Sequence, residues 1–241
     1  MLPQCRLART ARHGIIRAFS SIENTKLLLQ KVQAVCFDVD STVINEEGID
    51  VLAEYKGVGE KVIELTKKAM GGSVKFEDAL HDRLSLINPS IQDVTDCLMK
   101  HPFQLTPGVD TFINKLHSKG VAVYLVSGGF RQMINPIAKV LGIPNHRIYA
   151  NNLLFNIDGS FRGFDNTELT SRDGGKPAVI RKLKEAHGYN PIIMIGDGAT
   201  DLQAKPPADA FVGFGGVVVR DKVRDNADWF VKDFKELIDV L

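Results

Sequence analysis

The sequence predicts an α/β fold, with a Rossmann-like parallel sheet core, helices on both faces of the sheet and an inserted helical cap. Short, continuous apolar runs alternate with helical patterns over most of the chain. Such runs are typical of strands that are buried on both faces, as in parallel sheets. Between the first run and the second, residues 48–100 show helical periodicity and no strand pattern. We therefore predict a core formed by residues 23–47 and 101–241, and a cap formed by residues 48–100.

The composition is that of an ordinary soluble globular protein. The 241 residues are 44% hydrophobic and 24% charged, and a net charge of +1 gives no reason to expect nucleic acid or a membrane surface as a partner. Cys5, Cys36 and Cys97 form no Cys-x-x-Cys pair, which argues against a structural zinc site or a disulfide framework and fits a reducing compartment. No apolar run approaches the ~20 residues that a membrane-spanning helix needs.

Residues 1–22 differ from the rest of the chain, because the first acidic residue is Glu23 and arginines precede it. These arginines are Arg6, Arg9, Arg12 and Arg17. The segment resembles an organellar transit peptide, and the stretch from Arg17 to Ser21 resembles a mitochondrial cleavage site. The alternative is a disordered basic tail on a cytoplasmic protein. A mitochondrial, plastid or cytoplasmic location therefore stays open.

Local patterns predict the first strand and the helices of the cap. The apolar, β-branched run Val32–Phe37 predicts a strand, preceded by a helix-like segment that starts at residue 25. The cap contains successive helical patterns, each with a stop or start signal. These patterns end at Gly57, at Gly71-Gly72 and at Asn88-Pro89, and the last begins after Ser90 as N-cap.

Strands and helices alternate again after the cap. Thr106 as N-cap and Pro107 at the first helical position predict a helix that runs to His117. Asp158-Gly159 predicts the turn of a hairpin between strands 148–157 and 160–164. The other predicted strands are 121–126, 192–195 and 210–214, and the other predicted helices are 130–141, 174–186, a short one from 200, and 234–241.

Acidic and hydroxyl residues directly follow the predicted strands. Asp38 and Asp40 follow the first strand, and on an extended chain their side chains start on the same side. Ser127 and Asp197 follow two later strands, and Lys176 stands at the start of a helix. Because ligands bind at the carboxyl ends of the strands in a parallel sheet, we expect these side chains to share one edge.

These residue types suit phosphoryl transfer with a hard cation. Asp38 can attack phosphorus and form an aspartyl-phosphate, while Asp40 can protonate the leaving oxygen and then activate water. The cation that suits a few carboxylates and a phosphate is Mg²⁺, which we expect at Asp38 and Asp197 with a main-chain carbonyl near Asp40. The residues expected to bind phosphate oxygens are Lys176, Ser127, Gly128 and Gly129.

Asp201 and Thr200, which follow the predicted strand 192–195, each allow more than one interpretation. Asp201 either binds the metal through water or braces the loop after Gly198, and we favour the brace. Thr200 caps a helix, contacts the substrate, or does both. The six histidines show no ligand spacing and are interpreted as structural or exposed.

Four short motifs resemble those of the haloacid dehalogenase superfamily in order, spacing and strand context. They are Asp38-Val39-Asp40-Ser41-Thr42, Ser127-Gly128-Gly129, Lys176, and Gly196-Asp197-Gly198-Ala199-Thr200-Asp201. Further stretches resemble the phosphoserine phosphatase family within that superfamily. They are Glu46–Asp50, Ala69–Gly72, Phe76–Arg83, Ser127–Phe130 and Pro206–Ala210.

The closer resemblance implies a Mg²⁺-dependent phosphatase whose small-molecule substrate is O-phosphoserine, acting in the last step of serine biosynthesis. It also implies that Glu47 meets the substrate ammonium, that Arg83 binds its carboxylate, and that Met70 and Gly71 line the pocket. Such a site would suit a zwitterionic amino acid, because the Glu carboxylate would meet the ammonium group and the Arg guanidinium would meet the carboxylate.

Two alternatives stay open: a phosphatase or phosphotransferase for another small phosphomonoester, and a non-catalytic phosphometabolite-binding module on the same scaffold. The presence of both a nucleophile and an acid/base residue favours the enzyme. A homodimer is left open. Other motifs fail, because a nucleotide phosphate loop would need Ser or Thr in place of Pro177, and a hydrolase nucleophile elbow would need Gly in place of Leu125. A calcium loop would need Gly in place of Val43.

Overall fold

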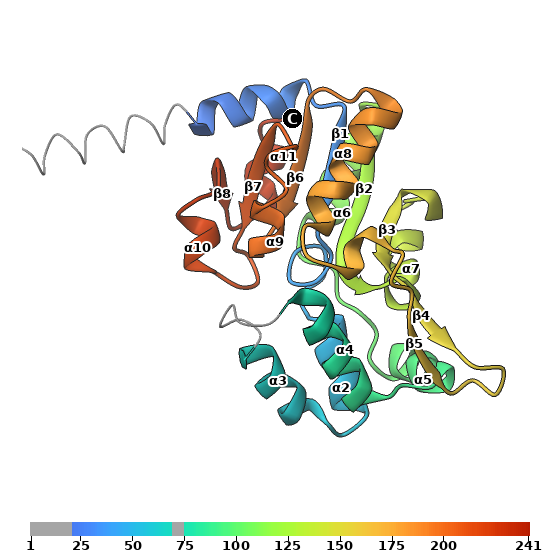
Figure 1. The fold of residues 1–241 in the computed structure, drawn as a ribbon. Helices are drawn as coiled ribbons and strands as arrows, with labels where there is room; N and C mark the ends of the chain where they lie inside the picture. The colour runs from blue at the N-terminus through green and yellow to red at the C-terminus, as the bar shows by residue number, and fades with distance from the viewer. Residues whose placement is uncertain (1–20, 69–74) are drawn as a thin grey trace, which may run out of the picture.

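The computed structural model describes residues 21–68 and 75–241. Its centre is a six-stranded parallel sheet with the strand order β3-β2-β1-β6-β7-β8 (Figure 1). The strands are β1 (Ala34–Phe37), β2 (Ala122–Phe130), β3 (Ile148–Asn151), β6 (Ile192–Gly196), β7 (Ala210–Phe214) and β8 (Trp229–Val231). The order places β1 inside the sheet, between β2 and β6. The predicted α/β class with a Rossmann-like parallel sheet is confirmed.

The side chains of β1 alternate between two apolar layers, one on each face of the sheet. Val35 and Phe37 pack into one layer, whereas Ala34 and Cys36 pack into the other. Burial on both faces explains why this strand is a continuous apolar run. The first layer is covered by helix 21–30, α6 (Val109–Ser118), α7 (Arg131–Val140) and α11 (Phe234–Ile238). The second layer is covered by α8 (Gly175–His187), α9 (Ala199–Leu202) and α10 (Asp221–Arg224).

A group of helices follows β1 and lies beyond its carboxyl end (Figure 1). They are α2 (Gly48–Tyr55), α3 (Gly59–Lys68), α4 (Phe76–Ile87) and α5 (Ile91–Lys100). Their apolar side chains form a cluster of their own, in which Leu52, Leu80, Leu84 and Cys97 are buried. Ser90 caps α5 through a capping box with Asp93, as predicted. The division into a core and a cap at residues 48 and 100 stays a prediction.

The hairpin is shorter than predicted. Residues Ile148–Asn151 form β3 and pair with β2 in the main sheet, so their assignment to a hairpin strand is wrong. The hairpin itself consists of β4 (Leu153–Phe155) and β5 (Phe161–Phe164), antiparallel around the Asp158-Gly159 turn. The two parts cannot be separated by apolar pattern, since only backbone pairing distinguishes them. The hairpin side chains pack against the cluster of α2–α5.

Two further boundaries differ from the prediction. Helix α6 begins at Val109, because Gly108 takes the N-cap position with a φ of 82°. Thr106 therefore does not cap this helix, and its hydroxyl is buried without a hydrogen-bond partner among the described residues. Strand β2 continues to Phe130, because Phe130 pairs with Asn151 of β3. The short elements β8 and α10 were not predicted.

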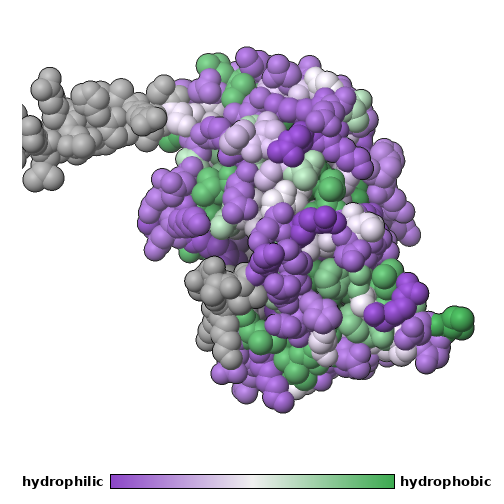
Figure 2. Space-filling model, viewed as in Figure 1, coloured by the Kyte–Doolittle hydropathy of each residue, from purple (hydrophilic) through white to green (hydrophobic). Residues whose placement is uncertain are grey.

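The surface of the molecule is mixed in character. Figure 2 shows polar residues that separate small apolar patches on the face in view. The turn of the hairpin β4–β5 carries Ile157, whose side chain is fully exposed. Across residues 21–68 and 75–241, every helix is too short or too polar to cross a bilayer.

Candidate active site

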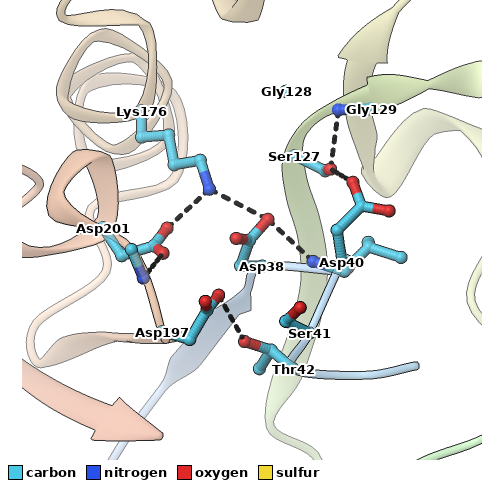
Figure 3. Close-up of polar contacts among 12 residues, drawn as sticks. Asp38, Asp40, Ser41, Thr42, Ser127, Gly128, Gly129, Lys176, Asp197 and Asp201 are labelled. Carbon is cyan, nitrogen blue, oxygen red and sulfur yellow. Dashed lines mark hydrogen bonds and ion pairs between the residues drawn. The ribbon is translucent and has the colours of Figure 1, made fainter. Parts of the chain in front are cut away.

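The carboxyl ends of β1, β2 and β6 bring Asp38, Ser127 and Asp197 together (Figure 3). Phe37, the last residue of β1, is paired with Leu125 of β2 and with Ile195 of β6, so Asp38, Ser127 and Asp197 lie one or two residues beyond the same level of the sheet. All three polar side chains are buried. The structure thus places at one edge the side chains that the sequence analysis expected there.

A cluster of carboxylates occupies this edge. One carboxylate oxygen from each of Asp38, Asp197 and Asp201 lies within 4.8 Å of the other two. The Asp40 side chain turns away from this group toward Ser127 (Figure 3). The predicted metal set of Asp38, Asp40 and Asp197 therefore differs from this cluster in one side chain. A contribution from the main-chain carbonyl near Asp40 stays a prediction.

The electrostatics of the cluster favour a bound cation. Burial raises the pKa of Asp197, and the nearby Asp38 raises it further. The same two causes, in the same order, raise the pKa of Asp201 well above its usual value. Buried carboxylates this close repel one another unless positive charge lies between them. Oxygen donors of this kind are the ligands of hard divalent cations, so the residues fit such an ion.

Lys176 supplies positive charge from the first turn of α8. Its Nζ lies 2.9 Å from Asp38 Oδ1 and 2.6 Å from Asp201 Oδ1, and the side chain is buried. Burial alone would lower the pKa of Lys176, but the carboxylates of Asp201 and Asp38 outweigh it and raise the pKa above the usual value. The ammonium is therefore charged at neutral pH. Gly175 lets the first turn of α8 lie against the main chain of Leu169, since a Cβ there would stand 2.2 Å from the Leu169 carbonyl oxygen.

Asp201 braces the loop that follows β6. Its Oδ2 accepts a hydrogen bond from the Gly198 N–H at 2.9 Å, while its Oδ1 accepts from Lys176. The predicted brace is confirmed by this contact. The side chain also packs closely over Gly196, where a Cβ would lie 2.3 Å from Asp201 Cγ. Asp201 thus fixes the path of the loop and adds a carboxylate oxygen to the cluster.

Asp40 lies in a separate, tightly bounded position. Its Oδ1 accepts a hydrogen bond from the Gly48 N–H at 2.8 Å, and its Oδ2 accepts from the Ser127 hydroxyl at 3.4 Å. The Gly129 N–H donates to Ser127 Oγ at 2.9 Å. Burial, together with the charges of Glu47 and Asp38, raises the pKa of Asp40 to about 8. This carboxyl therefore carries a proton at neutral pH, as a general acid must.

A cavity of about 150 Å³ opens above these residues. Its walls come from the sheet edge and from α4, so it lies between the strand ends and the helices that follow β1. The predicted site residues that line it are Asp38, Asp40, Glu47, Arg83, Gly128, Gly129, Lys176 and Thr200. Met70 and Gly71, also predicted for the pocket, lie outside the described residues.

Glu47 and Arg83 place opposite charges in the cavity wall. Glu47 Oε1 accepts a hydrogen bond from the Ser41 hydroxyl at 2.8 Å. Burial raises the pKa of Glu47 to about 7, against the lowering effect of that hydrogen bond. Arg83 is partly buried, which lowers its pKa, and the charges of Asp50 and Glu47 counteract that effect. Its Nε donates to the Ala79 carbonyl at 3.0 Å, which fixes the guanidinium on α4.

Comparison with known proteins assigns the family. The model of the haloacid dehalogenase-like hydrolases matches residues 32–206, the stretch that contains every residue of the carboxylate cluster. The chain belongs to this hydrolase family. It is 50% identical to phosphoserine phosphatase from Bos taurus, over 89% of this chain and 95% of the bovine one. It is 52% identical to the chloroplastic phosphoserine phosphatase of Arabidopsis thaliana, over 89% of this chain and 73% of the plant protein.

A solved structure shows the same likeness for this haloacid dehalogenase-like hydrolase. The phospho-aspartyl intermediate analogue of a phosphoserine phosphatase has a TM-score of 0.76 and 29% sequence identity to it. The match covers 87% of this chain and 99% of that chain. The recognised family and the resemblance found in the sequence motifs are thus confirmed.

Arg220 is a site residue of this hydrolase that the sequence analysis missed. Its Nε lies 2.8 Å from Asp197 Oδ2, and its Nη2 lies 3.4 Å from Glu47 Oε1. The guanidinium therefore joins a residue of the carboxylate cluster to a residue at the start of α2. No local pattern indicates this role, because Arg220 stands alone in a loop before α10.

Asn151 was also missed, because β3 was assigned to the hairpin. It is fully buried at the end of β3, and its Nδ2 donates to the Gly128 carbonyl at 2.8 Å. Its Oδ1 accepts from the Thr170 hydroxyl at 3.0 Å. Asn151 thereby fixes the peptide that follows Gly128, in the wall of the cavity. A correct strand assignment would have placed Asn151 at the sheet edge with the other site residues.

Proposed function

We propose that this hydrolase is a Mg²⁺-dependent phosphatase that converts O-phosphoserine to serine and phosphate through an aspartyl-phosphate. The observation that carries the proposal is the pair of aspartates on the cavity wall. Asp38 is ion-paired to a buried lysine, whereas Asp40 is held apart from it with a pKa of about 8. One carboxylate is thus ready to attack while the other is ready to donate a proton.

The proposed first step forms one bond and breaks one. A carboxylate oxygen of Asp38 bonds to phosphorus, the bond from phosphorus to the seryl oxygen breaks, and that oxygen takes the proton of Asp40. In the second step Asp40, now ionised, accepts a proton from water as the water oxygen bonds to phosphorus. The acyl phosphate bond then breaks and Asp38 is restored. Lys176, Ser127 and the main chain at Gly128 and Gly129 bind the phosphoryl oxygens.

For the metal, we propose Asp38 and Asp197 as carboxylate ligands, a main-chain carbonyl near Asp40, and Asp201 beside them. This follows from the clustered oxygens and from the repulsion between them. When bound, Mg²⁺ supplies positive charge that offsets the repulsion between an attacking carboxylate and a phosphate.

We propose that substrate choice rests on Glu47 and Arg83 in the cavity wall. The serine ammonium would lie at Glu47 and the carboxylate at Arg83, because each then meets its opposite charge. Thr200 also lines the cavity and is proposed as a further substrate contact, and so are Met70 and Gly71. The helices of residues 48–100 act in this proposal as the cap that carries specificity. Release of serine is consistent with a place at the end of serine biosynthesis.

The test is phosphate release from a panel of small phosphomonoesters, with Mg²⁺ and with EDTA. The expected result is Mg²⁺-dependent turnover, with O-phosphoserine preferred over phosphothreonine, glycerol phosphate and an aryl phosphate. Preference for another ester would change the substrate, and transfer of phosphate to an added alcohol would indicate a phosphotransferase. Binding of the esters without turnover would indicate a non-catalytic module. Light scattering on the same samples would test whether a homodimer forms.

A further inference from the structure

The loop between β1 and α2 folds back on itself, so that residues 46–48 form hydrogen bonds with residues 40–41. The Gly48 N–H donates to Asp40 Oδ1, the Ser41 N–H donates to the Glu46 carbonyl at 3.1 Å, and the Ser41 hydroxyl donates to Glu47. Ser41 adopts a left-handed conformation with φ of 52°, which is uncommon outside glycine. The three contacts join the residues next to the nucleophile to the first turn of α2.

The space around the Asp40 carboxyl is closed on both sides by glycines. A Cβ on Gly48 would lie 3.3 Å from Asp40 Oδ1, and a Cβ on Gly129 would lie 2.7 Å from Oδ2. Met133 also packs beside Gly48, with its Sδ 3.7 Å from where a Cβ on Gly48 would stand. The carboxyl is therefore confined by close packing as well as by its hydrogen bonds to Gly48 and Ser127.

The Gly48 N–H is one of the helix-start donors that have no partner within the helix. The N-cap residue Glu47 makes no side-chain capping bond, and its carboxylate instead accepts from Ser41. Asp40 is therefore the group that satisfies the first amide of α2. The dependence is mutual, because the same amide fixes one oxygen of Asp40.

We propose that the Gly48 main-chain amide is the positioning group of Asp40. It orients the carboxyl so that its proton faces the leaving oxygen, and it makes acid catalysis depend on α2 being seated against the sheet edge. The inference rests on the proposed function, in which Asp40 protonates the leaving group. Gly48 itself touches neither substrate nor phosphorus in this scheme.

The decisive variant replaces Gly48 with glycolic acid, which puts a main-chain ester oxygen in place of the N–H and adds no atoms. The loss of this donor breaks no helical bond, because the amide stands at the first position of α2. Proline is unsuitable here, because its Cδ would replace the hydrogen that points at Asp40 Oδ1 and would push the carboxyl aside. The matched control is Gly48→Ala, which keeps the N–H.

The assay measures the first step alone, as pre-steady-state release of the leaving group from two esters that differ in their need for a proton. The steady-state kcat would not separate them, because Asp40 also activates water against the aspartyl-phosphate that both esters form. Phosphoserine leaves as an alkoxide and needs the acid, whereas 4-nitrophenyl phosphate leaves as a stabilised phenolate and does not. For the glycolate variant we expect the first-step rate constant with phosphoserine to fall about 100-fold, the low end of a general acid's contribution. The first-step loss with 4-nitrophenyl phosphate should stay below about 5-fold. Asp40→Asn should show the same contrast and sets the largest loss expected.

Equal losses on both esters would overturn the inference, because they would mean a general distortion of the site. Unchanged first-step rate constants on both would overturn it as well. Failure of the glycolate variant to fold would also overturn it, because the amide would then be structural. If the parent enzyme prefers another alkyl phosphate, the proposed substrate is wrong, and that ester replaces phosphoserine in the comparison. A parent enzyme without turnover of any ester removes the proposed function and this inference together.

Discussion

Replacing Lys176 with methionine should destabilise the protein strongly, because it removes the cation shared by two buried carboxylates. The Nζ lies within 2.9 Å of Asp38 and 2.6 Å of Asp201, and the Asp201 side chain is wholly inaccessible. Removing one partner of a buried ion pair costs about 3–5 kcal/mol, since the remaining charge is left without compensation. Methionine keeps the length and the apolar stem of the side chain, so the loss measures the charge rather than a cavity.

Lys184 on the same helix provides a matched control. It pairs with Asp209 at 2.8 Å, but both side chains are more than a quarter exposed. Solvent screens such a pair, so Lys184→Met should cost only about 0–1 kcal/mol. The assay is urea unfolding in EDTA, followed by the fluorescence of Trp229, the single tryptophan, which is buried. Equal free energies of unfolding for the two variants would refute the electrostatic account of the Lys176 cluster.

The pH dependence of this loss has a definite sign. The pKa of Asp201 in the folded protein is raised by burial and then by Asp38, so the folded state binds a proton more tightly than the unfolded state. Such a group lowers stability as pH rises above the ordinary carboxyl value of about 3.9. Without the ammonium, the pKa of Asp201 rises further. The free energy lost in Lys176→Met should therefore be larger at pH 8 than at pH 5.5, and a loss that shrinks with rising pH would contradict this reasoning.

Three further predictions concern the nucleophile, substrate choice and helix capping. Asp38→Asn should remove turnover of phosphoserine and of 4-nitrophenyl phosphate by more than about 1,000-fold, while the protein stays folded because Lys176 keeps its ion pair with Asp201 at 2.6 Å; substantial residual activity in steady-state assays would exclude Asp38 as the nucleophile. Arg83→Ala should reduce kcat/KM for phosphoserine at least ~10-fold more than for 4-nitrophenyl phosphate, because only phosphoserine has a carboxylate to bind; equal losses would rule out that contact. Asp93→Ala should cost about 1–2 kcal/mol in urea unfolding, since Asp93 accepts from the Ser90 N–H and pairs with Lys56 at 2.7 Å. The half-buried Asp96 on the same helix makes only a solvent-exposed hydrogen bond, to Gln92, and its replacement by alanine should cost less than about 0.5 kcal/mol. A similar loss at both positions would contradict the role of Asp93 in the cap.

The strand ends of the site could be predicted from the sequence because they depend on local signals. A buried parallel strand is a short apolar run, and the residue after it must lie at the carboxyl edge of the sheet. Asp38, Ser127 and Asp197 were placed in this way, and the structure brings them together. The pattern does not predict how side chains are oriented in the loops that follow the strands. It therefore could not show that the Asp40 side chain contacts Gly48, whereas the Asp201 side chain belongs to the carboxylate cluster.

The missed features depend on contacts between distant parts of the chain. Arg220 reaches Asp197 from a loop with no distinguishing composition. Asn151 was misplaced because edge pairing with β2, and not apolar pattern, decides that residues 148–151 belong to the main sheet. Thr106 has the side chain of an N-cap residue, but Gly108 takes that position with a φ of 82° and the helix starts at Val109. The first two outcomes depend on contacts between distant parts of the chain, which the periodicity of a single sequence does not reveal.

The packing of the hairpin on the helices after β1 has a consequence for chimeric proteins. Leu153, Phe155, Phe161 and Phe164 belong to the same apolar cluster as Leu52 and Leu84, although they come from the opposite half of the chain. A graft that exchanges residues 48–100 alone would strip these aromatic rings of their packing partners and leave them in water. A chimera designed to change substrate preference should therefore exchange residues 153–164 together with residues 48–100, so that the hairpin and the helices that pack on it come from the same protein.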